Sequence, residues 1–440
     1  MNHRTNIDAA TPVEAVTIHP AAADGTVLLR ELERLSHPAY FRPLIGAFPF
    51  PVARVSGPDE IIATARDGLP GGPARPEAIA VRLRRRGVPL TIGAPDRVPT
   101  AAALLRSSHA RGESSVDVIR ADPSLLTELQ IGSWFHTSAR MRGLRLVLLR
   151  VQLPTSALRY SSLLALGCDL AFWAGVRSAA SAHEWRRLTR SSYVCLYYHR
   201  IAGEMKPGQE RLDLSPKTFR RQMRLLRLFR FRPLSPDELL RFHADPSVTL
   251  PRRRYVVTAD DAFADAAAAL ARHLSHRPHL YVSTAVVGGS ADWADGERLA
   301  GWDQLRSLHD RGAIVGSHGR THVVLTDLAD GVLDEELTGS LRELGARLGH
   351  PAPFLAYPHG RHDATVRAAA QRAGYRLAYT TRPGRNGAGT DPYCLRRLGI
   401  KEWDVAPSFV WKLLSGEHLP RGWERLWLRK RSSAVAGDGG

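Results

Sequence analysis

The pattern of apolar and polar positions changes along the chain and divides it near residue 190. Upstream of this point, short apolar runs that predict strands alternate with segments whose apolar residues have helical spacing. The runs are residues 78–83, 116–119 and 144–153, and the helical segments are residues 100–110 and 123–141. Strands that alternate with helices indicate an α/β domain. We therefore expect a smaller α/β N-terminal region over residues 1–155, of unassigned function, and a helical connector over residues 156–190.

Downstream of residue 190 the alternation is more regular. Strands are predicted at residues 193–199, 253–259, 279–287 and 313–317, and helices at residues 214–229 and 302–312. Ser215 directly before Pro216 is typical of a helix start. Repeated strand-helix units with polar residues after the strands are how a parallel barrel builds an active site at its carboxyl edge. We predict such a barrel over residues 191–412, followed by a basic amphipathic tail over residues 413–440.

Composition narrows the classes of partner. Of 440 residues, 44% are hydrophobic, and the formal net charge of +18 comes almost wholly from arginine. No recognition helix, zinc finger or aromatic stacking motif accompanies this charge, so nucleic acid is not expected as a partner. The first twenty residues lack the apolar core of a secretory signal, which predicts a cytoplasmic protein. Residues 422–431 place tryptophan and leucine beside basic residues, which favours either a peripheral contact with an anionic inner membrane face or an ordinary packed helix.

Two adjacent carboxylates and a pair of histidines carry the candidate chemistry. Asp260 and Asp261 follow an apolar run directly, where they repel each other unless a cation or a proton shares the site. His318 and His322 are spaced i, i+4, so a helical segment would place both on one face. Two imidazoles and one carboxylate suit a divalent metal with open positions for water and substrate. Helix capping by one aspartate is the alternative reading of the pair.

Five ordered motifs then resemble the polysaccharide deacetylase, or NodB-homology, family of carbohydrate esterases over about residues 193–410. They are VVTADDAFAD, VGSHGRTH, FLAYPHGRHD, AGYRLAYTTRPG and LRRLGI. The family fold is a distorted (β/α) barrel that binds zinc or another divalent metal. The resemblance thus implies an α/β chain with such a barrel at its C-terminal end, preceded by the smaller α/β region. The motif order is closest to the circularly permuted poly-N-acetylglucosamine deacetylase type.

Carried over by position, the resemblance implies a role for each residue of these motifs. Asp260 corresponds to the catalytic base, and the metal ligands correspond to Asp261, His318 and His322. The substrate-binding wall corresponds to Tyr357, Pro358 and His359, with the backbone N–H of Tyr357 as the oxyanion donor. Many members take a proton-donating acid from a Leu-x-His motif near the C-terminus, which is absent here after residue 390.

The strand CLYYH, which ends in His199, resembles the early acid-bearing strand of the permuted type. His199 is therefore assigned as the general acid, against the alternative of a structural histidine, with His359 and His362 as fallback acids. The family's Thr-Phe-Asp-Asp-Gly motif has Ala259 and Ala262 in place of the Phe and the Gly. The arginine before the wall motif is missing, and Arg361 is only a loose substitute.

The sequence thus predicts metal-dependent hydrolysis of N-acetyl groups on an amino-sugar glycan or glycan precursor, with zinc the expected metal. Two alternatives stay open. The departures at residues 259 and 262 are compatible with a catalytically weak or inactive saccharide-binding module. A metal-dependent amidohydrolase acting on a non-sugar amide also fits a barrel with this metal set.

Overall fold

The chain divides into two compact units, Met1–Leu188 and Thr189–Gly440. The computed structural model describes residues 16–18, 53–54, 90–92, 101–149, 161–203, 213–349 and 353–419. The predicted strand at residues 78–83 and the predicted membrane-contacting segment at residues 422–431 lie outside these ranges. No helix in the described ranges has the length and apolar character needed to cross a membrane.

The first unit combines a small sheet with helices. Its three strands, in the order β2-β1-β3, are β1 (Val16–Ile18), β2 (Ala53–Arg54) and β3 (Leu90–Ile92). The helices in the described part of this unit are α5 (Ala101–Ala121), the 3-10 helices η1 (Pro123–Thr127) and η2 (Gln130–His136), α6 (Ala139–Leu148), α7 (Ser161–Ala179) and α8 (Ala182–Thr189). Helices α5 and α7 cross closely, because a Cβ on Gly112 or Gly175 would lie 2.0 Å from a carbonyl oxygen of the other helix.

Two strand predictions in this unit are wrong. Residues 116–119 belong to α5, and residues 144–148 belong to α6. Along α5 the buried positions recur every three or four residues but include Ser108, Gly112 and Ser115, so the apolar pattern did not reveal the helical face. In α6 the only buried side chain is Arg145, which makes two 2.7 Å hydrogen bonds to Asp169 of α7.

The second unit is built on a nine-stranded sheet in the order β14-β13-β12-β9-β8-β4-β15, with β7 paired to β8 and β16 paired to β4. Within this sheet the strand pairs are parallel except for β15 with β4. The strands are β4 (Ser192–Tyr198), β7 (Arg232–Pro233), β8 (Arg254–Ala259), β9 (His279–Val282), β12 (Ile314–Ser317), β13 (Phe354–Ala356), β14 (Leu377–Tyr379), β15 (Arg385–Gly387) and β16 (Leu398–Gly399). The predicted strands of this unit are present, but the one expected over residues 279–287 ends at Val282, and a 3-10 turn, η5 (Thr284–Val286), follows it.

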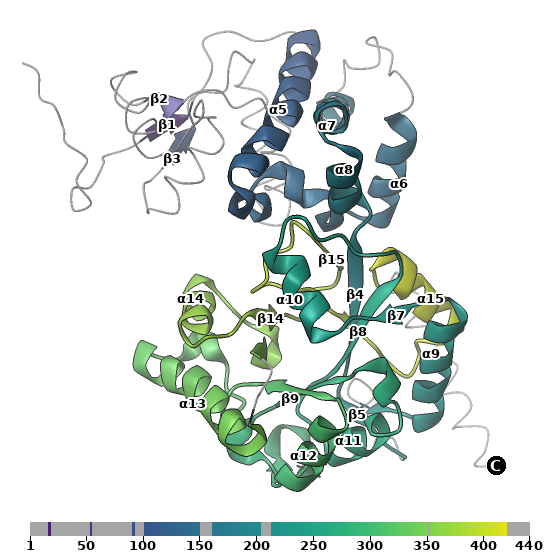
Figure 1. The fold of residues 1–440 in the computed structure, drawn as a ribbon, viewed down its shortest axis with the longest axis vertical. Helices are drawn as coiled ribbons and strands as arrows, with labels where there is room; N and C mark the ends of the chain where they lie inside the picture. The colour runs from purple at the N-terminus through teal and green to yellow at the C-terminus, as the bar shows by residue number, and fades with distance from the viewer. Residues whose placement is uncertain are drawn as a thin grey trace, which may run out of the picture. The chain divides into compact units, whose positions relative to one another are not determined.

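The sheet curls into a distorted barrel, as expected. Leu395 forms a bridge with Tyr379 of β14, and Leu398 of β16 pairs with Leu196 of β4, so residues 395–399 link two distant strands of the sheet. Helices lie around the outside of the curved sheet (Figure 1). They are α9 (Pro216–Leu228), α10 (Pro236–Ala244), α11 (Ala264–Leu270), α12 (Trp302–Asp310), α13 (Asp330–Leu348), α14 (Ala364–Arg372) and α15 (Ala406–Ser415).

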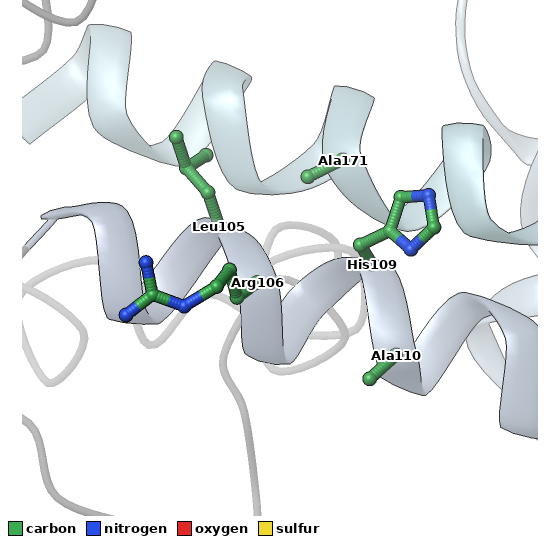
Figure 2. A pocket seen from close by; sticks show the side chains of 5 residues that line it. All are labelled: Leu105, Arg106, His109, Ala110 and Ala171. Atoms are coloured by element: carbon green, nitrogen blue, oxygen red, sulfur yellow. The ribbon is translucent and has the colours of Figure 1, made fainter.

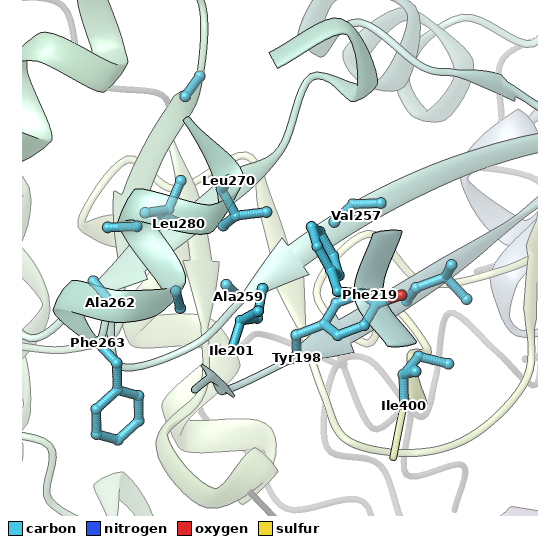
Figure 3. Packing of buried hydrophobic residues seen from close by; sticks show 14 of the residues in the cluster. Tyr198, Ile201, Phe219, Val257, Ala259, Ala262, Phe263, Leu270, Leu280 and Ile400 are labelled. Carbon is cyan, nitrogen blue, oxygen red and sulfur yellow. The ribbon is translucent and has the colours of Figure 1, made fainter. Parts of the chain in front are cut away.

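Local sequence explains where these helices begin. Ser215 caps α9 by accepting a hydrogen bond from the N–H of Thr218, and Pro216 occupies the first helical position. The apolar face of α9 then packs on the sheet. Figure 3 shows Phe219 beside Tyr198 of β4 and Val257 of β8, within the largest cluster of buried apolar side chains. This packing fixes the carboxyl ends of the central strands.

Two short strand pairs border the carboxyl edge. Strands β5 (Arg200–Ile201) and β6 (Asp213–Leu214) are parallel, and β10 (Ser290–Ala291) and β11 (Glu297–Arg298) form an antiparallel pair. A 3-10 turn, η6 (Asp292–Ala294), lies between β10 and β11 and carries Trp293. The cysteines Cys168, Cys195 and Cys394 are free, in agreement with the absence of a disulfide pattern in the sequence.

Candidate functional site

The predicted site residues follow the carboxyl ends of neighbouring parallel strands. His199 follows β4, Asp260 and Asp261 follow β8, His318 follows β12, and the wall motif follows β13. The N–H of Asp260 donates to the carbonyl of Tyr198 at 3.0 Å, which continues the β4–β8 pairing by one residue. Because parallel strands share this edge, residues 120 positions apart along the sequence can reach one site.

Three of these residues form a buried cluster. Oδ1 of Asp261 lies 3.1 Å from Nε2 of His322 and 3.4 Å from Nε2 of His318. Ligand atoms of the three residues all lie within 4.8 Å of one another, and all three residues are buried. Oδ1 of Asp261 is buried without a hydrogen-bond partner. A shared cation would satisfy it, and two imidazoles with one carboxylate are a donor set for a divalent metal.

The second nitrogen of His318 fixes its orientation. Nδ1 lies 2.7 Å from the carbonyl oxygen of Ala356 in β13, so it carries the proton and donates to that oxygen. The lone pair of Nε2 then faces Asp261, which is the arrangement that metal-binding histidines use. Burial raises the pKa of Asp261, but the imidazoles of His322 and His318 outweigh it and hold this pKa below its usual value.

The helical reading of the His318–His322 spacing is wrong. These residues lie in an irregular loop after β12, and Gly319 and His322 adopt φ values of 76° and 63°. The two rings converge because the loop reverses, with centroids 5.1 Å apart. In the turn after β8, Asp261 and Ala262 also have positive φ values, 65° and 51°. Ala262 thus occupies the left-handed region at the position where the family motif has glycine, a conformation that costs a residue with a Cβ roughly 1–2 kcal/mol.

Asp260 has a different partner, which the sequence analysis missed. The Arg397 guanidinium makes two hydrogen bonds to its carboxylate, Nη1 to Oδ1 at 2.6 Å and Nη2 to Oδ2 at 2.7 Å. Arg397 is fully buried and also donates to the carbonyl of Thr380 at 2.9 Å. Burial raises the pKa of Asp260, but Arg397 and His318 lower it further, so the carboxyl is held ionised. The available signal was a pair of arginines between two leucines in the late strand motif LRRLGI.

His199 lies beside the two aspartates, and its side chain is half-buried. The β4–β8 register, which pairs Tyr198 with Ala259, places it next to Asp260. Burial lowers the pKa of His199 to about 4, although Asp261 and Asp260 act in the opposite direction. Its imidazole is therefore neutral near pH 7 in this structure.

In the wall motif, the backbone nitrogen of Tyr357 does not have the expected role. The N–H of Tyr357 donates to the carbonyl of Tyr379 at 3.0 Å, which extends the β13–β14 pairing, so its assignment as an oxyanion donor is wrong. Pro358 has no N–H. His359 is exposed, has a φ of 56°, and is the second residue of a 3-10 turn, a position whose N–H has no acceptor within the turn. His362 stacks on the Tyr357 ring, with centroids 5.0 Å apart.

Aromatic rings surround one face of the cluster. The Trp293 indole stacks on the His322 ring, with centroids 3.9 Å apart and planes 24° apart. The His359 ring lies 4.8 Å from that of His322. Trp293 is therefore a neighbour of a predicted metal ligand that the sequence analysis did not select.

A separate pocket lies in the first unit. Its volume is about 370 Å³, and Figure 2 shows Leu105, Arg106, His109 and Ala110 of α5 opposite Ala171 of α7. None of the predicted site residues lines it. Its side chains offer no nucleophile or set of metal ligands.

Comparison with known proteins agrees with the motifs. Residues 248–378 match the family model described as polysaccharide deacetylase, and this range contains the two aspartates, the two histidines and the wall motif. The resemblance to the polysaccharide deacetylase family is thereby confirmed. Arg397 and His199 lie outside the matched range.

Individual relatives are distant. The chain is 24% identical over 98 residues to the Bacillus subtilis (strain 168) protein named "Putative polysaccharide deacetylase YxkH", an alignment that covers 22% of this chain and 35% of the relative. Similar solved structures include the Streptococcus pyogenes deacetylase PplD in complex with acetate and IcaB from Ammonifex degensii. Each is 22% identical with a TM-score of 0.44; each alignment covers 51% of this chain, with 98% of PplD and 96% of IcaB.

Proposed function

We propose that this chain removes N-acetyl groups from an amino-sugar glycan or glycan precursor by metal-dependent hydrolysis. The observation that carries the proposal is the buried cluster of Asp261, His318 and His322 next to a second carboxylate, Asp260, that is held ionised by Arg397. One carboxylate can bind a metal while its neighbour stays free to move protons. The family match adds the acetylated saccharide as the class of substrate.

Asp261, His318 and His322 would hold the metal, with zinc the best candidate for two nitrogens and one oxygen. A divalent metal in this position would polarise the acetyl carbonyl and lower the pKa of a water molecule toward neutrality. The burial of all three ligands, together with the fixed tautomer of His318, limits the reorganisation that binding needs.

Asp260 would accept the proton of the attacking water. Arg397 occupies one lone pair on each of its oxygens, which leaves further lone pairs available, and the fork fixes the plane of the carboxylate. The backbone N–H of His359 is our candidate oxyanion donor, because Tyr357 uses its own in the sheet and Pro358 has none.

His199 is our candidate for protonating the leaving amine. Since its imidazole is neutral near pH 7, it must gain a proton during the reaction, and the proton that Asp260 takes from water is the nearest source. His199 could therefore protonate the leaving amine only after Asp260 had taken a proton from water.

Acetate release from chito-oligosaccharides by the full-length protein tests the proposal. We expect activity to disappear with a chelator and to return with zinc. Asp260→Asn should lower the rate by at least about 100-fold without loss of bound zinc, because the base is not a ligand. His322→Ala should lose both zinc and activity. The exposed Asp303 of α12 provides the control Asp303→Asn. Acetate release that persists after metal removal, or normal turnover by folded Asp260→Asn, would refute the assignment.

A further inference from the structure

A buried glutamate of α13 holds the loop that carries the two histidines. Oε2 of Glu336 accepts hydrogen bonds from the backbone N–H of Arg320 at 2.7 Å and of Thr321 at 3.0 Å. Oε1 accepts a third from the Thr321 hydroxyl at 2.6 Å. Glu336 is only 6% exposed. Both oxygens of one carboxylate are thus directed at the three-residue segment between His318 and His322.

The carbonyl groups of this segment have backbone donors, since those of Gly319 and Arg320 accept hydrogen bonds from the N–H groups of Thr284 at 3.3 Å and Ala285 at 2.8 Å. The segment belongs to neither a helix nor a strand, so its backbone donors depend on such side-chain acceptors. Gly319 has a φ of 76°, and a Cβ there would lie 3.3 Å from Oε2 of Glu336, so the backbone passes close to the carboxylate. His322 itself has a φ of 63°, a conformation that a non-glycine residue keeps only when its surroundings enforce it.

A second contact ties the same strand end to α13. The hydroxyls of Ser317 and Ser340 are 2.8 Å apart, and Oγ of Ser317 accepts the N–H of Gly319 at 3.1 Å. The loop is therefore anchored to α13 at its start and in its middle. The strongest set of contacts is that of Glu336, because hydrogen bonds to an ionised carboxylate are about twice as strong as neutral ones.

We propose that Glu336 is a positioning residue for the metal centre. By clamping residues 320 and 321 it turns His322 toward Asp261, so that metal affinity depends on a carboxylate that does not touch the metal. Its two oxygens are already engaged, which separates its role from that of a ligand. This inference rests on the proposed metal site, but it concerns the loop and can fail independently.

Zinc affinity of the full-length protein, measured by competition with a chromogenic chelator, tests the proposal. Outer residues that orient metal ligands typically change affinity by 10–100-fold, and we expect Glu336→Ala to weaken zinc binding by about this factor. Glu336→Gln keeps one carbonyl oxygen for the two N–H groups, so its zinc affinity should fall less than that of Glu336→Ala. The neighbouring Glu335 is exposed and pairs with Arg342, so Glu335→Gln is the matched control and should bind zinc as the wild type does.

Thr321 gives a second route if Glu336→Ala does not fold. Thr321→Val removes the hydroxyl that donates to Oε1 and should weaken zinc binding, whereas Thr321→Ser should restore it, a rescue that general destabilisation would not give. The positioning role of Glu336 alone would be overturned if the wild type, Glu336→Ala and Thr321→Val bound zinc equally well, each with a normal thermal transition without metal. Failure of the wild type to bind zinc would overturn the metal centre and the clamp together.

Discussion

The buried ion pair between Asp260 and Arg397 gives the sharpest test of this structure. The Arg397 side chain is 0% exposed and that of Asp260 is 4% exposed. Removing one partner of a buried pair leaves an unpaired charge and typically costs about 3–5 kcal/mol. We therefore expect Arg397→Met and Asp260→Asn each to lower the free energy of unfolding of the second unit by about this amount. For a domain of 150–250 residues this corresponds to a fall in Tm of about 6–20 °C.

The double variant, Asp260→Asn with Arg397→Met, distinguishes the energy of the ion pair from that of the other contacts of each residue. Arg397 also donates to Thr380 and lies over the Tyr197 ring, so each single substitution removes more than one contact. When both charges are gone, no unpaired charge remains. The loss of unfolding free energy in the double variant should therefore be smaller than the sum of the two single losses by about 0.5–3 kcal/mol, the usual range for residues in contact.

Calorimetry is the suitable assay because the two compact units can give separate transitions. Arg145→Met serves as the matched control, since Arg145 forms a comparable buried pair with Asp169 in the first unit. Arg145→Met should lower the transition temperature of the first unit and leave that of the second unchanged. Additive effects of the Asp260 and Arg397 substitutions, or a loss below about 1 kcal/mol for Arg397→Met, would refute the electrostatic reasoning.

Two further predictions concern His279 in the sheet and Trp293 beside the cluster of Asp261, His318 and His322. Burial lowers the pKa of His279 to about 3, so the unfolded chain binds a proton near pH 6.5 that the folded chain excludes, and stability falls as the pH falls. Between pH 7 and pH 5 this should lower the free energy of unfolding by about 2 kcal/mol. His279→Phe should reduce the fall in Tm over the same pH range. An unchanged pH dependence of Tm in this variant would contradict the lowered pKa of His279. Because Trp293 stacks on His322, zinc should alter tryptophan fluorescence in the wild type and in Trp302→Phe, but much less in Trp293→Phe. A full response from Trp293→Phe would disprove the coupling.

The sequence predicted best those strands whose side chains are buried on both faces. In β4 and β8 nearly every residue is buried, so each reads as a continuous apolar run and its carboxyl end is marked by the first charged or histidine residue. This is why residues 199, 260 and 318 could be assigned to one edge without a structure. The same criterion failed in α6, where Arg145 is buried and Leu146 and Val147 are exposed, so that the apolar run did not indicate a strand.

Long-range partners explain most of what sequence reasoning missed in the site. Arg397 lies 137 positions after Asp260, and although the arginine pair in LRRLGI stands out, its sequence does not show which carboxylate it meets. The Tyr357 N–H was assigned from the resemblance alone, but the parallel β13–β14 pairing, invisible in the motif, uses it. Glu336 lies on a helix with an ordinary charge pattern, and only the path of the preceding loop shows that its carboxylate points inward.

The two adjacent aspartates illustrate how one dipeptide can supply two chemically distinct groups. Asp260 still follows the strand, and its carboxylate meets a permanent positive charge on the segment that closes the barrel. Asp261, one residue later, has left the strand with a φ of 65°, and its carboxylate meets the imidazoles of His318 and His322 instead. The Arg397 guanidinium engages both oxygens of the first carboxylate, whereas Oδ1 of the second is buried without a hydrogen-bond partner. The left-handed turn at Asp261 and Ala262 is thus the local feature that gives our proposed base and our proposed metal ligand different partners, and its strain is the cost of placing both carboxylates within one site.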